Sequence, residues 1–141
     1  MKKELICLKI KNEGRIKMND SIISEKLEQY LLARKEEFEK EINQCKYKMF
    51  MGEKDEYYSS QYDIQDFSKK LQFINLCLEM KPIERVEYFY NVLLENLDKQ
   101  TCQYQCREKA NELRTILNGY KDAESLANQY EDRATILKNN K

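Results

Sequence analysis

Two cysteines, Cys102 and Cys106, have the spacing that could place two thiolates on one side of a helix. Thiolates in that position can share a metal ion, and structural zinc takes four ligands, mostly from Cys and His. The chain contains no His, so Cys45 and Cys77 or carboxylates would have to complete the site. Because Cys also packs as a small apolar residue, we interpret the pair as buried side chains and predict no metal or other cofactor. A metal or redox role for the pair is the open alternative.

Carboxylates are the other chemically capable groups, and several of them gather in the first half of the chain. These are Glu36, Glu37, Glu39, Glu41, Asp63 and Asp66. Helical di-iron proteins need Glu-x-x-His motifs, and Ser or Cys nucleophiles are usually activated by His, so the absence of His excludes both. None of the three Gly has a second Gly close enough to form a phosphate-binding loop. We therefore expect a protein that is not an enzyme, with its carboxylates on solvated helix faces.

Aromatic and Met side chains exceed what a helical core needs at three places. Three consecutive apolar residues occur at one of them, and consecutive helix residues cannot all face a core. The Tyr residues that follow are accompanied by Ser and Gln, a composition typical of protein interfaces. These interface residues are predicted to be Met49, Phe50, Met51, Tyr57, Tyr58, Tyr62 and Tyr88. The alternative is that they pack on neighbouring helices of the same chain.

The preferred function follows from these exclusions. We expect a small protein-binding protein, such as an adaptor, inhibitor or assembly factor, that acts through helix surfaces. Its partner would be another protein or a second copy in a homodimer. An odd number of Cys, five, without a signal-peptide pattern favours the reducing cytoplasm. Its size and mixed charge resemble in type the accessory proteins of bacteria and phages.

Residues 122–137 carry the alternative function, because they weakly resemble a helix-turn-helix. Leu126, Ala127 and Tyr130 would form its inner face, and the segment from Arg133 would read DNA. The expected turn contains Glu131 and Asp132 instead of Gly, and phosphate would repel their charges. A nucleic-acid-binding regulator is therefore the second hypothesis, and we do not expect nucleic acid as the partner.

Composition predicts one helical domain. The chain has 141 residues, with 25 Lys plus Arg and 25 Asp plus Glu. Only three Gly and one Pro are present, far too few for the turns of a β-sandwich or barrel. No uncharged apolar window is long enough for a transmembrane helix. We expect an all-α bundle of four to five amphipathic helices with coiled-coil-like packing, as a single domain over residues 18–141.

Gly and Pro mark where the helices should end, because they are the strongest breakers. Between them, apolar residues recur at steps of three and four, which is the helical period. The first predicted helix covers 18–51 and is capped at Asn19-Asp20-Ser21. The second follows an apolar stripe that begins at Ile64 and stops before Pro82. The remaining helices are predicted at 83–97, 102–118 and 120–141. A loop at 98–101, with Thr101 as a cap, and a break at Asn118-Gly119 separate the last three.

Residues 1–17 differ from the rest and allow two interpretations. Glu4–Lys11 alternates as a strand would, so a short β-hairpin closing at Gly14 is one of them. In the other, Glu13-Gly14-Arg15 is encoded by a purine-rich ribosome-binding sequence just before Met18. Natural translation would then start at Met18, and 1–17 would be a non-native extension. Without it the chain has 19 basic and 23 acidic residues.

Overall fold

The computed structural model describes the backbone of residues 2–52 and 54–139, and the side chains of residues 21–139 except 53 and 55. Five α-helices and no strand occur within this described part: α1 (Lys2–Met51), α2 (Lys54–Glu79), α3 (Pro82–Glu95), α4 (Gln103–Thr115) and α5 (Ala123–Asn139). The expectation of an all-helical protein with packed helices is confirmed.

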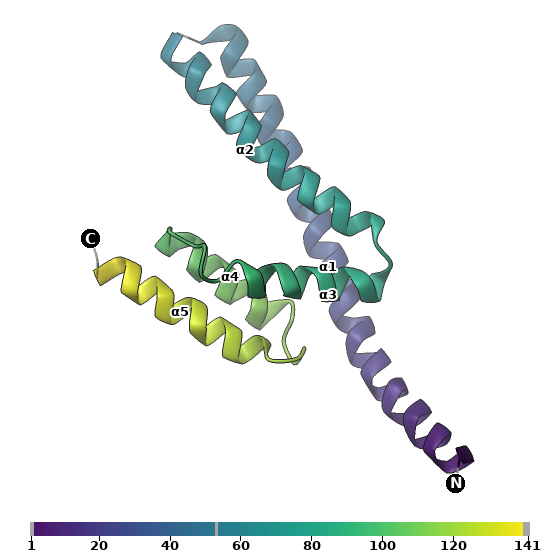
Figure 1. Ribbon diagram of the computed structural model, residues 1–141. Helices are drawn as coiled ribbons and strands as arrows, with labels where there is room; N and C mark the ends of the chain where they lie inside the picture. The colour runs from purple at the N-terminus through teal and green to yellow at the C-terminus, as the bar shows by residue number, and fades with distance from the viewer. Residues whose placement is uncertain (1, 53, 140–141) are drawn as a thin grey trace. The chain divides into compact units, whose positions relative to one another are not determined.

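The chain divides into two compact units, and α1 contributes to both (Figure 1). The first unit consists of Met1–Leu27 and Pro82–Lys141, and the second of Glu28–Lys81. A single domain over residues 18–141 stays a prediction.

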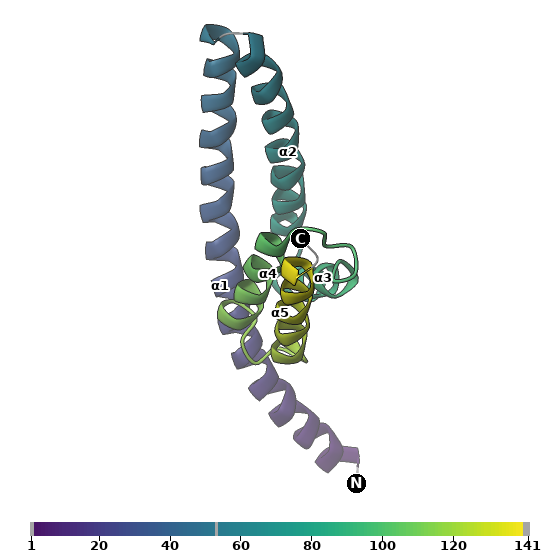
Figure 2. The same cartoon turned by 90° about the vertical axis from the view of Figure 1, so that its left-hand side faces the viewer.

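The second unit is a helical hairpin. From Glu28 onward α1 runs beside α2 in the opposite direction, and Gly52 lies at their connection (Figures 1 and 2). On α1 the buried residues Leu31, Phe38 and Cys45 recur every seven residues. On α2 the buried residues Ser60 and Ile74 are separated by twice that spacing. Phe67, midway between Ser60 and Ile74, meets Phe38 with ring centroids 5.7 Å apart. The apolar stripe of each helix therefore faces the other helix, as amphipathic spacing requires.

Cationic side chains cover the aromatic pair at the middle of this hairpin. The Arg34 guanidinium lies 4.6 Å from the centroid of the Phe38 ring. The Lys70 ammonium lies 5.6 Å from the Phe67 centroid and also pairs with Asp66 at 3.1 Å. The aliphatic stems of Arg and Lys can cover apolar surface while their charged ends stay in water. This is why the charged Arg34 can lie between Leu31 and Phe38 on the buried side of α1 without opening the hairpin.

In the first unit, α4 and α5 form an antiparallel pair (Figure 2). Apart from Tyr130, their buried residues are small residues and leucines spaced by three and four, so the two backbones can approach closely. The buried members are Cys106, Ala110, Leu113, Ala123, Leu126, Ala127, Tyr130 and Ala134. From α3, Val86, Phe89, Tyr90 and Leu93 are buried in the same unit.

Two loops separate the last three helices where the sequence predicted breaks. Gly119 has a φ of +86°, a left-handed conformation that Gly adopts without a Cβ clash, so α4 and α5 are not one helix. Pro82 opens α3, and α3 ends at Glu95. The cap of α4 is Cys102, not the predicted Thr101, and no side-chain hydrogen bond caps this helix.

The N-terminal half of α1 differs from the sequence expectation. Neither Gly14 nor the predicted cap at Asn19-Asp20-Ser21 interrupts α1. The β-hairpin considered for residues 1–17 is not confirmed, because the backbone is helical from Lys2. A lone two-stranded hairpin is marginal in water, whereas a helix satisfies its backbone hydrogen bonds within itself. One Gly costs a helix only about 1 kcal/mol, which the surrounding turns can offset.

Candidate functional site

The end of the hairpin next to Gly52 exposes large apolar side chains on α1. Phe50 is 89% exposed, Tyr47 68% and Met51 66%, whereas Met49 is half-buried. Each helical residue turns about 100°, so Tyr47 and Phe50 lie roughly opposite the buried Cys45. These side chains therefore point away from α2.

Three tyrosines occupy the first turns of α2. Tyr62 is 72% exposed, Tyr58 60% and Tyr57 43%. Tyr58 and Tyr62 lie two residues before and after the buried Ser60, so both point away from α1. The rings of Tyr57 and Tyr58 make an edge-to-face contact with centroids 5.6 Å apart. Such packing limits the freedom of exposed rings before any partner binds.

Six of the seven predicted interface residues thus lie at the same end of one hairpin, but on opposite sides of it. Tyr88 lies elsewhere, in α3 of the other unit, where it is half-buried beside the buried Phe89. The structure adds Tyr47 to the group. Its signal in the sequence is the i, i+3 and i, i+4 spacing to Phe50 and Met51, on the side opposite the apolar stripe.

The charges around this end are mixed. Lys46, Lys48, Lys54, Glu56 and Asp63 are all exposed. Burial first, and then the nearby Asp63 carboxylate, raise the pKa of the Cys45 thiol, while Lys48 acts against them. The thiol is consequently neutral at pH 7 and behaves as a small apolar side chain.

The two cysteines with metal-ligand spacing lie in different surroundings. Cys106 is fully buried and Cys102 is exposed. Burial is the main cause that raises the pKa of the Cys106 thiol. Across the described side chains, no group of three His, Cys, Asp or Glu residues could hold a metal ion.

The weak helix-turn-helix pattern is wrong as a structure. α5 is continuous from Ala123 to Asn139, with no turn at Glu131-Asp132. The physical reason is that Tyr130 and Ala134 are buried on the same helix side as Leu126, which an uninterrupted helix maintains. Arg133 also has another role, since its guanidinium donates to the Asp98 and Gln100 carbonyls at 2.9 and 2.8 Å.

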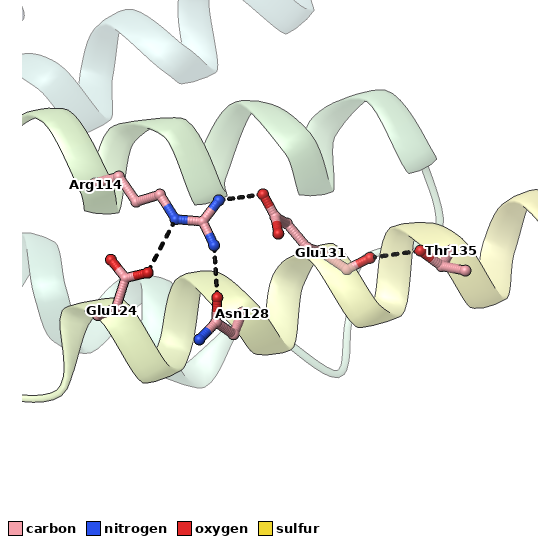
Figure 3. A network of polar contacts seen from close by, with 5 residues as sticks. All are labelled: Arg114, Glu124, Asn128, Glu131 and Thr135. Carbon is pink, nitrogen blue, oxygen red and sulfur yellow. Dashed lines mark hydrogen bonds and ion pairs between the residues drawn. The ribbon is translucent and has the colours of Figure 1, made fainter.

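Arg114 forms the main polar link between α4 and α5 (Figure 3). Its guanidinium donates to Glu124 at 3.4 Å, to the Asn128 side-chain oxygen at 2.6 Å, and to Glu131. The bond to Arg114 is the largest cause that lowers the pKa of Glu131, and the same bond raises the pKa of Arg114. These three partners lie on α5, so the cluster joins two helices and uses three of the five N–H donors of the guanidinium.

Replacement of Arg114 by Met should lower the stability of the protein at pH 7 and have a smaller effect in acid. Because the folded-state pKa of Glu131 is lowered, its stabilising contribution is lost as the pH falls through that lowered value. Urea unfolding of both proteins between pH 7 and pH 2 measures this. Lys99→Met, which removes an exposed charge in the same unit, is the matched control. An equal difference between Arg114→Met and the original protein at every pH would contradict the role of the ion pairs.

Within the described residues, no helix has both the length and the apolar content that crossing a membrane requires. Compared with protein-family models, curated proteins and solved structures, the chain is similar to none of them.

Proposed function

We propose that this chain is a non-catalytic protein-binding protein, an adaptor, inhibitor or assembly factor, whose hairpin end contacts a protein partner. The observation that carries the proposal is that Phe50, Met51, Tyr58 and Tyr62, each at least 60% exposed, lie within about three turns of Gly52. Isolated exposed apolar residues are ordinary, but several of them at one end of a hairpin, on opposite sides of it, suit a partner that contacts both sides of that end.

The chemistry of these residues supports the same conclusion. Tyr buries a large area at low entropic cost and keeps a polar end, and Met adapts to irregular surfaces. The mixed charges nearby provide a polar rim without a strong field of either sign, which suits a protein surface better than phosphate.

We also propose that the finer expectation, coiled-coil-like packing in a helical bundle, describes how this end is supported. The seven-residue spacing of Leu31, Phe38 and Cys45, facing Phe67 and Ile74, supports this. Toward Gly52 the buried residues are small, since Cys45 and Ser60 are, among the described side chains, the last buried one of α1 and the first of α2.

Affinity capture tests the proposal. The full chain is immobilised, incubated with a lysate of the organism that encodes it, and the captured proteins are quantified by mass spectrometry. Met51→Asp and Tyr58→Ala should each reduce the principal captured protein by about tenfold or more, the size of a hot-spot loss. Tyr104→Ala is the matched control, since Tyr104 is 78% exposed but lies in α4 of the other unit.

If the two hairpin variants capture the same proteins in the same amounts as the original chain, the proposal is wrong. If Tyr104→Ala alone reduces capture, the partner binds the first unit instead.

A further inference from the structure

The outer side of α1 within the hairpin faces away from α2. Six residues lie along it at alternating steps of three and four, the positions that would form a seam with another helix packed on this side; they are small or aromatic at the ends and polar in the middle. They are all exposed: Ala33, Glu36, Lys40, Asn43, Tyr47 and Phe50. The seam buried against α2 runs through Leu31, Phe38 and Cys45, so this pattern lies on the opposite side of the helix.

We propose that this seam binds a second copy of the chain, with the two α1 helices antiparallel. The two ends of the seam are complementary in size: Phe50, 89% exposed, is at one end and the small Ala33 is at the other. An antiparallel pair about a two-fold axis brings each end of one copy against the other end of its partner. Phe50 of each copy then covers Ala33 of the second copy, where no large side chain obstructs it.

The same register gives the polar residues suitable partners. In an antiparallel seam, pairing Ala33 with Phe50 also pairs Glu36 with Tyr47 and Lys40 with Asn43. The Tyr47 hydroxyl can donate to the Glu36 carboxylate of the second copy, and the Lys40 ammonium to the Asn43 side-chain oxygen. Every one of these contacts occurs twice because of the two-fold axis. Only Leu32 and Met51, half and two-thirds exposed, extend the apolar area at the edges.

Charges beside the seam select this register over its neighbours. The flanking positions bring Glu39 opposite Lys46 of the second copy, again twice, and both residues are exposed. A shift of seven residues in one direction would place Glu39 against Glu39, and in the other direction Lys46 against Lys46. Like charges at these positions repel, so of these three registers only the one that pairs Glu39 with Lys46 avoids this electrostatic penalty.

The expected dimer is weak. The exposed parts of these side chains amount to roughly 1,000 Å² over two copies, the lower limit for a specific interface. The seam shares Phe50 and Met51 with the surface proposed for the protein partner, but neither Glu39 nor Lys46 belongs to that surface. Changes at Glu39 and Lys46 therefore test dimerisation without altering the residues proposed to contact the partner.

Sedimentation equilibrium of the full chain between about 10 and 500 µM at low ionic strength tests the dimer. The average mass should rise from 17.1 kDa toward twice that value. Glu39→Lys and Lys46→Glu should each raise the dissociation constant about tenfold, because each opposes like charges twice. The double variant, which exchanges the two charges, should return to within about threefold of the original. Lys99→Glu, in the other unit, should have no effect.

A second measurement reports the register itself. A benzophenone amino acid in place of Tyr47 should cross-link to the tryptic peptide 36–40 of an isotope-labelled copy. A monomer at every concentration would overturn the proposal. So would a dimer that the single charge changes leave intact, since it would use another face, or a double variant no tighter than the single ones.

Discussion

Replacing Tyr130 with Ala should lower the free energy of unfolding by about 4 kcal/mol, because it empties a fully buried aromatic site. Tyr130 lies in α5, and its hydroxyl donates to the Leu93 carbonyl of α3. The variant loses the packing of the ring and also leaves that carbonyl without its donor. Chemical denaturation followed by circular dichroism measures the loss. Tyr104→Ala, at a tyrosine 78% exposed, should change stability by less than about 0.5 kcal/mol.

Tyr130→Phe separates the hydroxyl from the ring. It should cost about 1–2 kcal/mol, the price of a buried carbonyl without a hydrogen-bond donor. The pKa of Tyr130 is raised, first by burial and then by the nearby Cys106, from the ordinary value of 10.0. Its contribution is therefore complete below pH 10 and falls as the pH rises toward the raised folded-state pKa. A difference between the two proteins that stays constant up to pH 11 would contradict the buried, hydrogen-bonded position of this phenol.

Replacing Phe38 with Ala should destabilise the hairpin by about 3–4 kcal/mol. Phe38 is 5% exposed, contacts the Phe67 ring and lies beneath the Arg34 guanidinium. Its removal takes the central layer from the hairpin, so amide hydrogen exchange should accelerate most in residues 28–81. Phe50→Ala is a matched control, since it makes the same change on the same helix at a side chain 89% exposed, and should cost less than about 0.5 kcal/mol. Similar losses for the two variants would mean that the burial pattern of α1 is wrong.

The sequence alone determined the helical class and most helix ends. Gly52 and Pro82 lie at helix ends where the sequence predicted, and Gly119 lies in the predicted break, although α4 already ends at Thr115 and α5 begins only at Ala123. Backbone freedom and the missing Pro N–H are local properties, so they can be read from the sequence. The stripes of α1 and α2 also predicted which sides are buried. Local signals failed at Asn19-Asp20-Ser21 and Gly14, where α1 continues. Capping residues permit a helix to start but do not force the preceding residues to leave it.

The candidate site was likewise predicted from the sequence only in part. The sequence identified Phe50 and Met51 because adjacent helix positions cannot share one face. It identified Tyr58 and Tyr62 from the interface-like composition of their segment. It missed Tyr47, and it grouped Tyr88 with residues of a different unit. Which exposed residues lie near one another depends on how α1 and α2 pair, and pairing joins positions far apart in the chain, such as Phe38 and Phe67.

Residue type and spacing thus determined that this chain forms amphipathic helices. The absence of His led us to predict that its surfaces carry function, and this stays a prediction. Tertiary structure decided what each polar residue of those helices does. Arg133 bonds the Asp98 and Gln100 carbonyls, and Arg114 joins α4 to α5, although both could equally have served a ligand. Helical periodicity is set by the local backbone and can be read from neighbouring residues, whereas a hydrogen bond needs a partner that only folding brings within reach.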